Sequence, residues 1–569
     1  MVVSVHAEAS RAGVDILRSG GNAVDAAVAV GFALAVVHPQ AGNLGGGGFL
    51  LLRTADGAEH FLDFREQAPA QAQPDMYLDP SGRVIAGASV IGYRSIGVPG
   101  SVAGMAYAQR HWGRLSLAQV MAPAIRLARM GFTLSAQDCR DLRDRQLSRF
   151  ASSRRLFQRN GRYYVAGEIF RQPELARTLE RLAADPDEFY HGLMARQIAA
   201  GIRRGGGLVT EQDLAAYQPQ ERRPVHGSYR GYEIISAPPP SSGGVSLVEM
   251  LNILQGYDLS RYAARSPQAV HLVAESLRRA FFDRAEFLGD PDFSNVPVAQ
   301  LIDRRYGAAW REELNPGAAS RSADLRRPAI FSRLESYARL HPLEYPGHES
   351  QNTTHYSIVD AEGNAVAVTT TLNDTFGSRV TLGELGFLLN DEMDDFTSKP
   401  GTPNRYGLVQ GPANSIAPRK RPLSSMTPTI VLRPAGRPGV AAAPHDAAPN
   451  AALPDPAAPA KPELFLVLGS PGGPRIISTV ANILIDVIDH HTDIQAAVNS
   501  PRFHHQWMPD MLWVEPSLPA ATVAALERMG HRVRHDPAWS DGECILIDPK
   551  TGERLGASDW RHNGKALGY

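Results

Sequence analysis

The sequence predicts an α+β fold, in which helices dominate the chain as far as residue 303 and strands dominate from residue 353. Three observations support this prediction. The first third alternates apolar helical stretches with glycine turns, residues 115–303 keep mostly helical spacing, and β-rich runs follow residue 353. Helices and strands that are segregated along a chain in this way are typical of α+β proteins.

The first two helices are predicted from apolar spacing and from their end signals. Residues 7–19 have helical spacing, and Gly20 and Gly21 end this helix. Asn22 is suited to cap the next helix, which contains the longest apolar run, residues 26–37. A bilayer-spanning helix needs about 20 apolar residues, so we expect a helix buried in the core and no membrane span.

Strands are predicted where β-forming residues gather between turn signals. Residues 49–53 and 61–64 have this pattern, and the second strand brings Arg65 to the edge of a sheet. Residues 232–236 form another predicted strand, ahead of a run of prolines.

The C-terminal part of the chain predicts two further pairs of strands. Residues 354–360 and 365–371 are joined by a tight turn at 361–364, which is the arrangement of a β-hairpin. The second pair is 427–433 with 464–469.

The segment between the strands of the second pair, residues 434–463, has an unusual composition. It holds eight prolines and eleven alanines in thirty positions, and it has few of the aromatic and branched residues that a core needs. We predict a flexible surface insertion. Strand pairing tolerates such an insertion because the cost of closing a loop grows only logarithmically with its length.

The overall composition is that of an ordinary globular protein. The 569 residues are 43% hydrophobic and carry a formal net charge of −1, so the overall balance does not indicate nucleic acid or an anionic membrane surface as a partner. The two cysteines, Cys139 and Cys544, are too few for a disulfide framework or a cysteine-rich zinc site. Their positions in the sequence do not decide whether they pair.

Several motifs that suggest a ligand are weak. The glycine-rich segment 42–48 lacks the ending of a phosphate-binding loop, and we interpret it as a tight turn. His490 and His491, like His504 and His505, are adjacent pairs whose side chains diverge, and a pair alone is too small for a zinc site. We therefore predict no metal site and no cofactor.

The segment around Thr353 combines two separate features. Residues 344–351 are polar and contain Pro346, as expected of an exposed, cleavable linker, and a strand begins directly after them. On propensity alone, a threonine at the start of a strand is only a β-former. The N-glycosylation pattern at Asn352 is a match of three residues and carries less weight than a catalytic interpretation.

Flanking motifs favour the catalytic interpretation, because they occur in order over nearly the whole chain. They are 20–26 (GGNAVDA), 38–48 (HPQAGNLGGGG), 63–66 (DFRE), 352–357 (NTTHYS), 363–369 (GNAVAVT), 389–396 (LNDEMDDF), 421–426 (RPLSSM), 469–473 (GSPGG) and 556–559 (GASD). With these motifs the sequence resembles the γ-glutamyltranspeptidase (glutathione hydrolase) family.

The resemblance implies an N-terminal-nucleophile hydrolase with a four-layer αββα sandwich. In this family a precursor cleaves itself before a threonine. Here Thr353 would attack the carbonyl of Asn352, and an N-to-O acyl shift followed by hydrolysis would leave a large chain, 1–352, and a small catalytic chain, 353–569. We expect the two chains to stay together as a heterodimer because they share one core.

Cleavage would also create the catalytic base. A threonine hydroxyl is a poor nucleophile until a base takes its proton, and an adjacent free amine can do so. An α-amino group titrates near 7.7–8.0, which is roughly the optimum for a general base at neutral pH. In the uncleaved precursor the same nitrogen is an amide without a basic lone pair, so self-cleavage is expected to activate the enzyme.

The resemblance also implies the rest of the catalytic group. Thr371 would orient the hydroxyl of Thr353, and the backbone N–H groups of Gly472 and Gly473 would form the oxyanion hole. Glycine suits this position because its backbone approaches the tetrahedral oxygen without a Cβ in the way, and losing such a donor typically costs about 10²–10³ in rate.

A γ-glutamyl group carries an α-carboxylate and an α-ammonium, so its pocket needs both signs of charge. The positions implied by the resemblance are Arg65, Ser424 and Ser425 for the carboxylate, and Asn373, Glu392 and Asp395 for the ammonium. Residues 399–411, which include Tyr406, match a loop that covers the glutamyl site in many relatives and excludes water.

The implied activity is cleavage of glutathione and related γ-glutamyl amides through an ester on Thr353, with transfer to water, an amino acid or a dipeptide. One alternative is an acylase of the same fold whose substrates lack the α-amine, which Glu392 and Asp395 disfavour. Another is a γ-glutamyl-binding scaffold that has lost self-cleavage.

The resemblance also bears on location, because relatives are usually periplasmic, secreted or surface-bound. The first residues show no signal peptide. We expect a periplasmic or secreted protein whose sequence is truncated at its start, and a cytoplasmic variant is the alternative.

Overall fold

The structure is a computed structural model, and it describes residues 1–330, 353–434 and 461–569. Asn352, and all but the ends of the predicted insertion at 434–463, lie outside the described residues.

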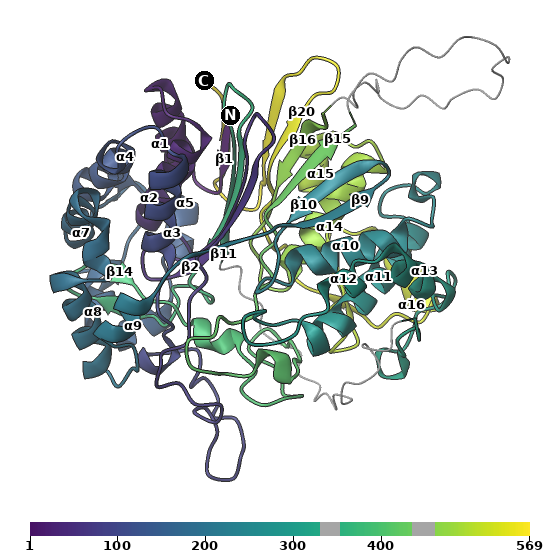
Figure 1. Cartoon of the computed structure of the whole chain (residues 1–569), viewed down its shortest axis with the longest axis horizontal. Coiled ribbons are helices and arrows are strands. Elements are labelled where there is room, and N and C mark those ends of the chain that lie inside the picture. Colours follow the sequence, from purple (N-terminus) through teal and green to yellow (C-terminus); the bar gives the residue numbers. More distant parts are fainter. Residues whose placement is uncertain (331–352, 435–460) are drawn as a thin grey trace.

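Two antiparallel sheets form the centre of the described chain (Figure 1). The seven strands of the first sheet are, in spatial order, β22 (Lys565–Leu567), β1 (Val2–Ser4), β11 (Thr353–Val359), β12 (Ala365–Thr371), β2 (Gly47–Arg53), β3 (Glu59–Asp63) and β8 (Gln220–Arg222). The six strands of the second sheet are β21 (Arg554–Ser558), β20 (Glu543–Ile547), β16 (Glu463–Leu468), β15 (Thr429–Arg433), β10 (Tyr232–Ser236) and β9 (Val225–Tyr229).

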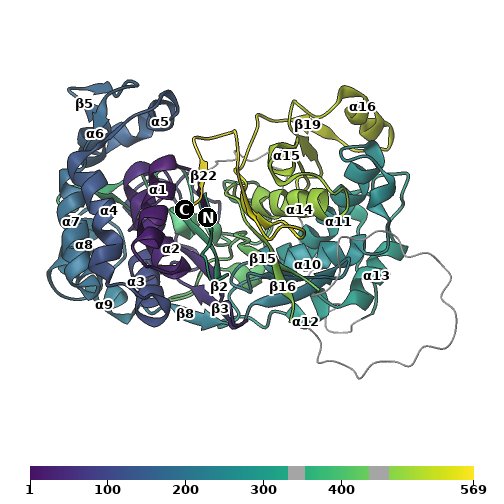
Figure 2. The ribbon, with the colours of Figure 1, turned by 90° about the horizontal axis from the view of Figure 1, so that it is seen from above.

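The two sheets face each other, and helices cover the outer face of each (Figures 1 and 2). The helices on the side of the first sheet are α1 (Ala7–Arg18), α2 (Ala23–Val37), α3 (Ser101–Trp112), α4 (Leu117–Met130), α7 (Pro173–Ala184), α8 (Gly192–Arg204) and α9 (Glu211–Ala216). Those on the side of the second sheet include α10 (Gly243–Leu254), α11 (Pro267–Phe287), α13 (Arg304–Glu312) and α14 (Arg475–Ile488). The α+β prediction is confirmed.

Smaller elements complete the two outer layers. They are α5 (Ala136–Asp141), α6 (Ala151–Phe157), α12 (Val298–Leu301), α15 (Ile494–Asn499), α16 (Ala520–Arg528), β4 (Phe132–Thr133), β5 (Gln158–Arg159), β6 (Arg162–Tyr163), β7 (Ile169–Phe170), β13 (Thr381–Leu382), β14 (Phe387–Leu388), β17 (Phe503–His504), β18 (Leu512–Val514) and β19 (Val533–His535).

The predicted core helix is α2, and it packs against strands of the first sheet. All of its residues except Gly31 are buried. The side chain of Asn22 accepts hydrogen bonds from the amides of Val24 and Asp25, which confirms the predicted cap. Within the described ranges no helix combines the length and apolar character that a membrane crossing requires.

The strand predictions are confirmed, with additions. The hairpin is β11 and β12, the second pair is β15 and β16, and β10 has the predicted bounds. Residues 115–303 also contain the short strands β4 to β9, which the helical pattern did not indicate. Strands of two or three residues, as β4 to β8 are, are too short for a recognisable alternation, and tertiary neighbours determine their pairing. The five residues of β9 (VHGSY) include a glycine and a serine and lack the run of β-forming residues that marks a strand.

Candidate active site

Thr353 lies at the start of β11, in the interior of the first sheet. Its Cα partner on β12 is Thr371, so the two side chains stand directly opposite each other. Their hydroxyl oxygens are 3.3 Å apart, and the residues are only 6% and 3% exposed. The predicted nucleophile and its predicted orienting hydroxyl are therefore brought together by the hairpin register.

The glycine-rich segment 42–48 packs against the backbone of Thr371. A Cβ at Gly46 would overlap the carbonyl oxygen of Thr371, and Asn43 donates to the same oxygen over 2.9 Å. None of these glycines has a positive φ, and β2 already begins at Gly47. The tight-turn interpretation is therefore wrong: these positions are glycine because neighbouring backbone and side-chain atoms come too close for a Cβ.

Gly472 and Gly473 adopt backbone conformations that favour glycine, with φ of 127° and 54°. They lie just before α14, so the positive end of that helix dipole points toward them. In the described part of the chain, neither backbone N–H donates to a protein acceptor. Both groups remain available for a developing oxyanion.

Arg65 lies two residues after the end of β3, since the strand ends at Asp63 rather than at the predicted Phe64, and it is 1% exposed. Its guanidinium forms ion pairs with Glu392 and Asp395, and one nitrogen lies 3.7 Å from Glu66. Its Nε also donates to the carbonyl of Pro422 over 3.2 Å. One cation is thus surrounded by three carboxyl groups in a buried pocket.

Burial dominates the electrostatics of this group. It raises the pKa of Glu66 to about 7, although the charge of Arg65 opposes the shift. Burial also raises the pKa of Glu392 well above its ordinary value, again against Arg65. For Arg65, burial would lower the pKa, but the neighbouring carboxylates outweigh it and raise the value.

A second buried guanidinium, that of Arg284 on α11, lies beside the two predicted serines. It donates to Ser425 Oγ over 3.1 Å and to Ser242 Oγ over 2.9 Å, and Ser242 in turn donates to the carbonyl of Ser424. Arg284 forms no salt bridge with a described residue, and burial lowers its pKa to about 10. Sequence reasoning missed this residue, because nothing in the helical pattern of α11 distinguishes it.

The predicted lid residue Tyr406 closes the site. Its hydroxyl lies 2.9 Å from both the carbonyl and the Oδ1 of Asn373, and its ring lies over Gly473. The cavity beneath the ring has a volume of only about 20 Å³, roughly the room for one water molecule. Lining residues include Thr353, Thr371, Arg65, Arg284, Asn373, Glu392, Asp395, Tyr406, Ser424, Ser425 and Gly473.

The lining includes every predicted site residue except Gly472, which lies next to Gly473, and Asn352, which is not described. The cavity as it stands is smaller than a glutamyl group.

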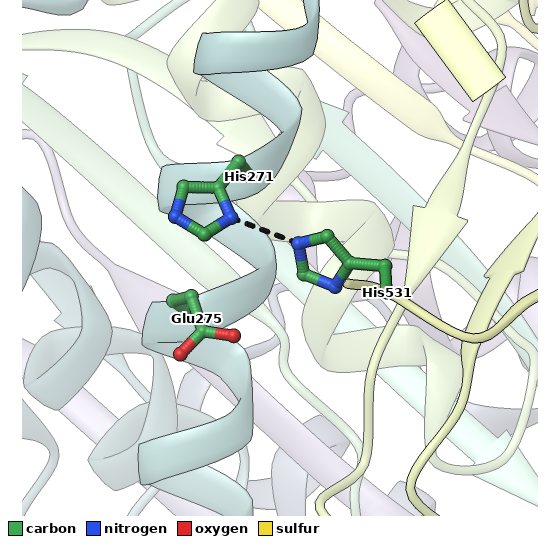
Figure 3. Close-up of side chains that lie close together, drawn as sticks. All are labelled: His271, Glu275 and His531. Atoms are coloured by element: carbon green, nitrogen blue, oxygen red, sulfur yellow. Dashed lines mark hydrogen bonds between the residues drawn. The ribbon is translucent and has the colours of Figure 1, made fainter. Parts of the chain in front are cut away.

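A separate cluster of possible metal ligands lies on α11 and in the loop after α16 (Figure 3). His271 and His531 face each other, with Nδ1 and Nε2 2.8 Å apart. Glu275 already accepts from the buried guanidinium groups of Arg278 and Arg279. Burial lowers the pKa of both histidines, and that of His531 falls to about 3. The contacts are those of a packed polar core, and the two arginines disfavour a cation there.

Solved structures of enzymes share the fold of this chain. A cephalosporin acylase from Bacillus halodurans aligns with a TM-score of 0.79 and 25% identity, covering 100% of this chain and 96% of that one. A γ-glutamyltranspeptidase chain from Helicobacter pylori aligns with a TM-score of 0.56 and 40% identity, covering 57% of this chain and 95% of that one. These are N-terminal-nucleophile hydrolases, and the chain has their α+β fold.

The family itself is shown by sequence. The γ-glutamyltranspeptidase family model matches residues 9–442 and 457–569. A glutathione hydrolase proenzyme of Escherichia coli K12 is 44% identical over 99% of this chain and 90% of its own length. An acylase proenzyme from a Pseudomonas strain is 36% identical over 99% and 92%. The chain belongs to the γ-glutamyltranspeptidase family.

Proposed function

We propose that the protein is a γ-glutamyl hydrolase and transpeptidase that cleaves itself before Thr353 and then acts on glutathione and related γ-glutamyl amides. The observation that carries the proposal is the position of Thr353. It begins an interior strand, its hydroxyl lies opposite Thr371, and it lines a pocket with charges of both signs. Relatives described as glutathione hydrolase proenzymes support the same activity.

Maturation would produce the large chain, 1–352, and the small chain, 353–569, which remain together as a heterodimer. The helix–sheet–sheet–helix order supports the αββα arrangement of an N-terminal-nucleophile hydrolase. Each product would contribute strands to both sheets, and the two would therefore share one core.

In the mature enzyme the freed α-amine of Thr353 accepts the proton of its own hydroxyl as Oγ1 attacks the γ-carbonyl carbon. The tetrahedral oxygen then accepts hydrogen bonds from the N–H groups of Gly472 and Gly473. The amine leaves with the proton, and a γ-glutamyl ester remains on Thr353. Water releases glutamate from this ester, whereas an amino acid or dipeptide takes the glutamyl group.

The charges of the pocket fit the two ends of a glutamyl group. Three carboxyl groups lie around one arginine, so acidic groups outnumber cations in the pocket. The ammonium of a substrate would lie beside Asn373, Glu392 and Asp395 and would supply a further positive charge. The α-carboxylate would lie against Ser424, Ser425 and Arg65, and the guanidinium of Arg284, which forms no salt bridge with a described residue, would add a second cation there.

Intact-mass spectrometry of three purified proteins, combined with a γ-glutamyl anilide assay, tests the proposal. The wild type should give two masses that correspond to 1–352 and 353–569, together with turnover. Thr353→Ala should give one undivided chain without turnover. Thr353→Ser should still be processed, because it keeps a hydroxyl, although more slowly than the wild type. Two masses from Thr353→Ala, or turnover by an uncut chain, would contradict the mechanism. A single inactive wild-type mass would support the scaffold alternative.

An acylase activity is the second candidate, because relatives described as acylases match the whole chain. A glutaryl anilide separates the two candidates, since it lacks the α-amine. We expect the protein to prefer the γ-glutamyl anilide, because Glu392 and Asp395 would otherwise face no ammonium. Equal turnover of both anilides would favour the acylase.

The location of the protein is proposed from the family alone. We propose a periplasmic or secreted enzyme, and fractionation of the cells that produce it, with the mature N-terminus read by Edman degradation, tests this.

A further inference from the structure

We propose that an arginine-rich corner of the molecule, residues 139–171, docks on an anionic phospholipid surface. This segment contains nine arginines and only three acidic residues, a formal charge of +6 in a chain whose net charge is −1. All nine arginine side chains are exposed; they are Arg140, Arg143, Arg145, Arg149, Arg154, Arg155, Arg159, Arg162 and Arg171.

Most of this charge is not neutralised by the protein. Arg159 and Arg162 form salt bridges, both with Glu168, at 3.6 Å and 2.7 Å. The other seven form none with the part of the chain that the structure describes; where they donate hydrogen bonds, the acceptors are neutral, such as the carbonyl of Gly383 for Arg155. An exposed cluster of this kind creates a local positive potential that the overall charge conceals.

The arginines lie together and line two neighbouring hollows. Figure 2 shows α5, α6 and β5 gathered at one corner of the molecule, away from the two central sheets. One hollow, of about 410 Å³, is lined by Arg154, Arg155, Arg159 and Tyr164. The other, of about 210 Å³, shares Arg155 and Tyr164 and adds Arg171, with one acidic residue, Glu174, in its lining. Guanidinium groups converging on a hollow are well suited to phosphate oxygens.

Apolar side chains project from the same corner, which favours lipid over a dissolved polyanion. Met130, Val165 and Ile169 are 68%, 48% and 43% exposed. Short contacts connect them to the arginines: Arg171 donates to the carbonyl of Met130 over 3.0 Å, and Glu168, the partner of Arg162, accepts from the amide of Val165 over 2.9 Å. Exposed apolar groups beside cations match a surface that offers both phosphates and hydrocarbon.

The inferred contact is peripheral, and it does not depend on the proposed catalytic function. Each basic residue near an anionic leaflet strengthens binding by about fivefold, and salt screens the attraction. Several such residues together give measurable binding without a spanning helix.

Vesicle co-sedimentation of the full-length protein tests the proposal. We expect retention on vesicles of equal parts phosphatidylglycerol and phosphatidylcholine, none on phosphatidylcholine alone, and release at high salt. The triple variant Arg154→Glu, Arg155→Glu, Arg159→Glu should bind roughly a hundredfold more weakly or worse. A control with the same change in net charge, Arg203→Glu, Arg204→Glu, Arg534→Glu, alters exposed arginines elsewhere and should bind normally.

A second readout reports insertion directly. The emission of Val165→Trp should shift to the blue with phosphatidylglycerol vesicles and stay unchanged with phosphatidylcholine. Equal weakening by the two triple variants, or equal binding to both vesicle types, would overturn the proposal. Retention on heparin or polyglutamate without vesicle binding would also overturn the proposal, and it would indicate an acidic polymer as the ligand in place of lipid.

Discussion

Charge is concentrated in two regions of this molecule, and burial separates their behaviour. Around Arg65, one guanidinium and three carboxyl groups lie largely buried in a narrow pocket. At the arginine-rich corner, nine arginines are exposed, and the three acidic residues of the segment are half-buried. Buried charges depend on fixed neighbours and respond to single substitutions and to pH, whereas exposed charges act as a sum and respond to salt. On our two proposals, arginine would recognise a single substrate group in the buried region and would attract an anionic surface in the exposed one.

The largest effect on the buried region is expected from Arg65→Ala. This variant removes two ion pairs and leaves carboxyl groups without a partner, so kcat/KM for a γ-glutamyl anilide should fall by about 10³. Self-cleavage should continue, because Thr353 and Thr371 belong to the hairpin. Gel analysis and kinetics check both points, and loss of processing would show that Arg65 supports the fold around the nucleophile.

A smaller, more selective effect is expected from Arg284→Met. If Arg284 faces the α-carboxylate, KM for the γ-glutamyl anilide should rise about 10–100-fold. Turnover of 4-aminobutanoyl anilide, which lacks this carboxylate, serves as the internal control and should hardly change. An equal loss with both substrates would reduce Arg284 to a packing residue.

Glu66→Gln should change the pH dependence of stability. Burial raises the pKa of Glu66 from 4.5 to about 7 in the folded protein, so the fold favours its protonated form. The resulting stabilisation is complete below pH 4.5 and disappears as the pH rises through 7. Wild-type stability should therefore decline across this interval, and Glu66→Gln should flatten the decline. Thermal unfolding at a series of pH values measures it, and parallel curves would refute the buried titration.

The smallest effect is the salt dependence of turnover. Raising the salt concentration should change kcat/KM for a γ-glutamyl anilide by less than about twofold, because buried pairs are weakly screened. The same change should release the protein from anionic vesicles. If turnover and vesicle binding declined in parallel, the distinction between the two regions would fail.

One part of the site follows from sequence, because Thr353 and Thr371 lie at the open end of the predicted hairpin. A turn of known length fixes the register, and the register places Thr353 opposite Thr371. Arg65 was predicted at the end of a strand and lies two residues after the end of β3. The remaining lining residues were identified from motifs rather than from propensities. The spacing of these residues along the chain does not show that they meet in one pocket.

What could not be predicted depends on tertiary proximity. Arg284 enters the site only because α11 packs against the loop that carries Ser425. The need for glycine at Gly46 comes from the carbonyl of Thr371, far away in the sequence. The arginine-rich corner was hidden by averaging, because acidic residues elsewhere cancel its charge.

The interleaving of strands has a consequence for how the protein unfolds and refolds. In the first sheet β1 lies between β22 and β11, so strands of the two proposed products interleave there, and in the second sheet they meet where β10 pairs with β15. Before cleavage, refolding is a unimolecular reaction of one chain, and its rate does not depend on concentration. Afterwards it requires an encounter of two partners, and its rate depends on their concentration. The proposed cut would therefore make the mature particle an effectively one-way product, whose lifetime is governed by the barrier to unfolding.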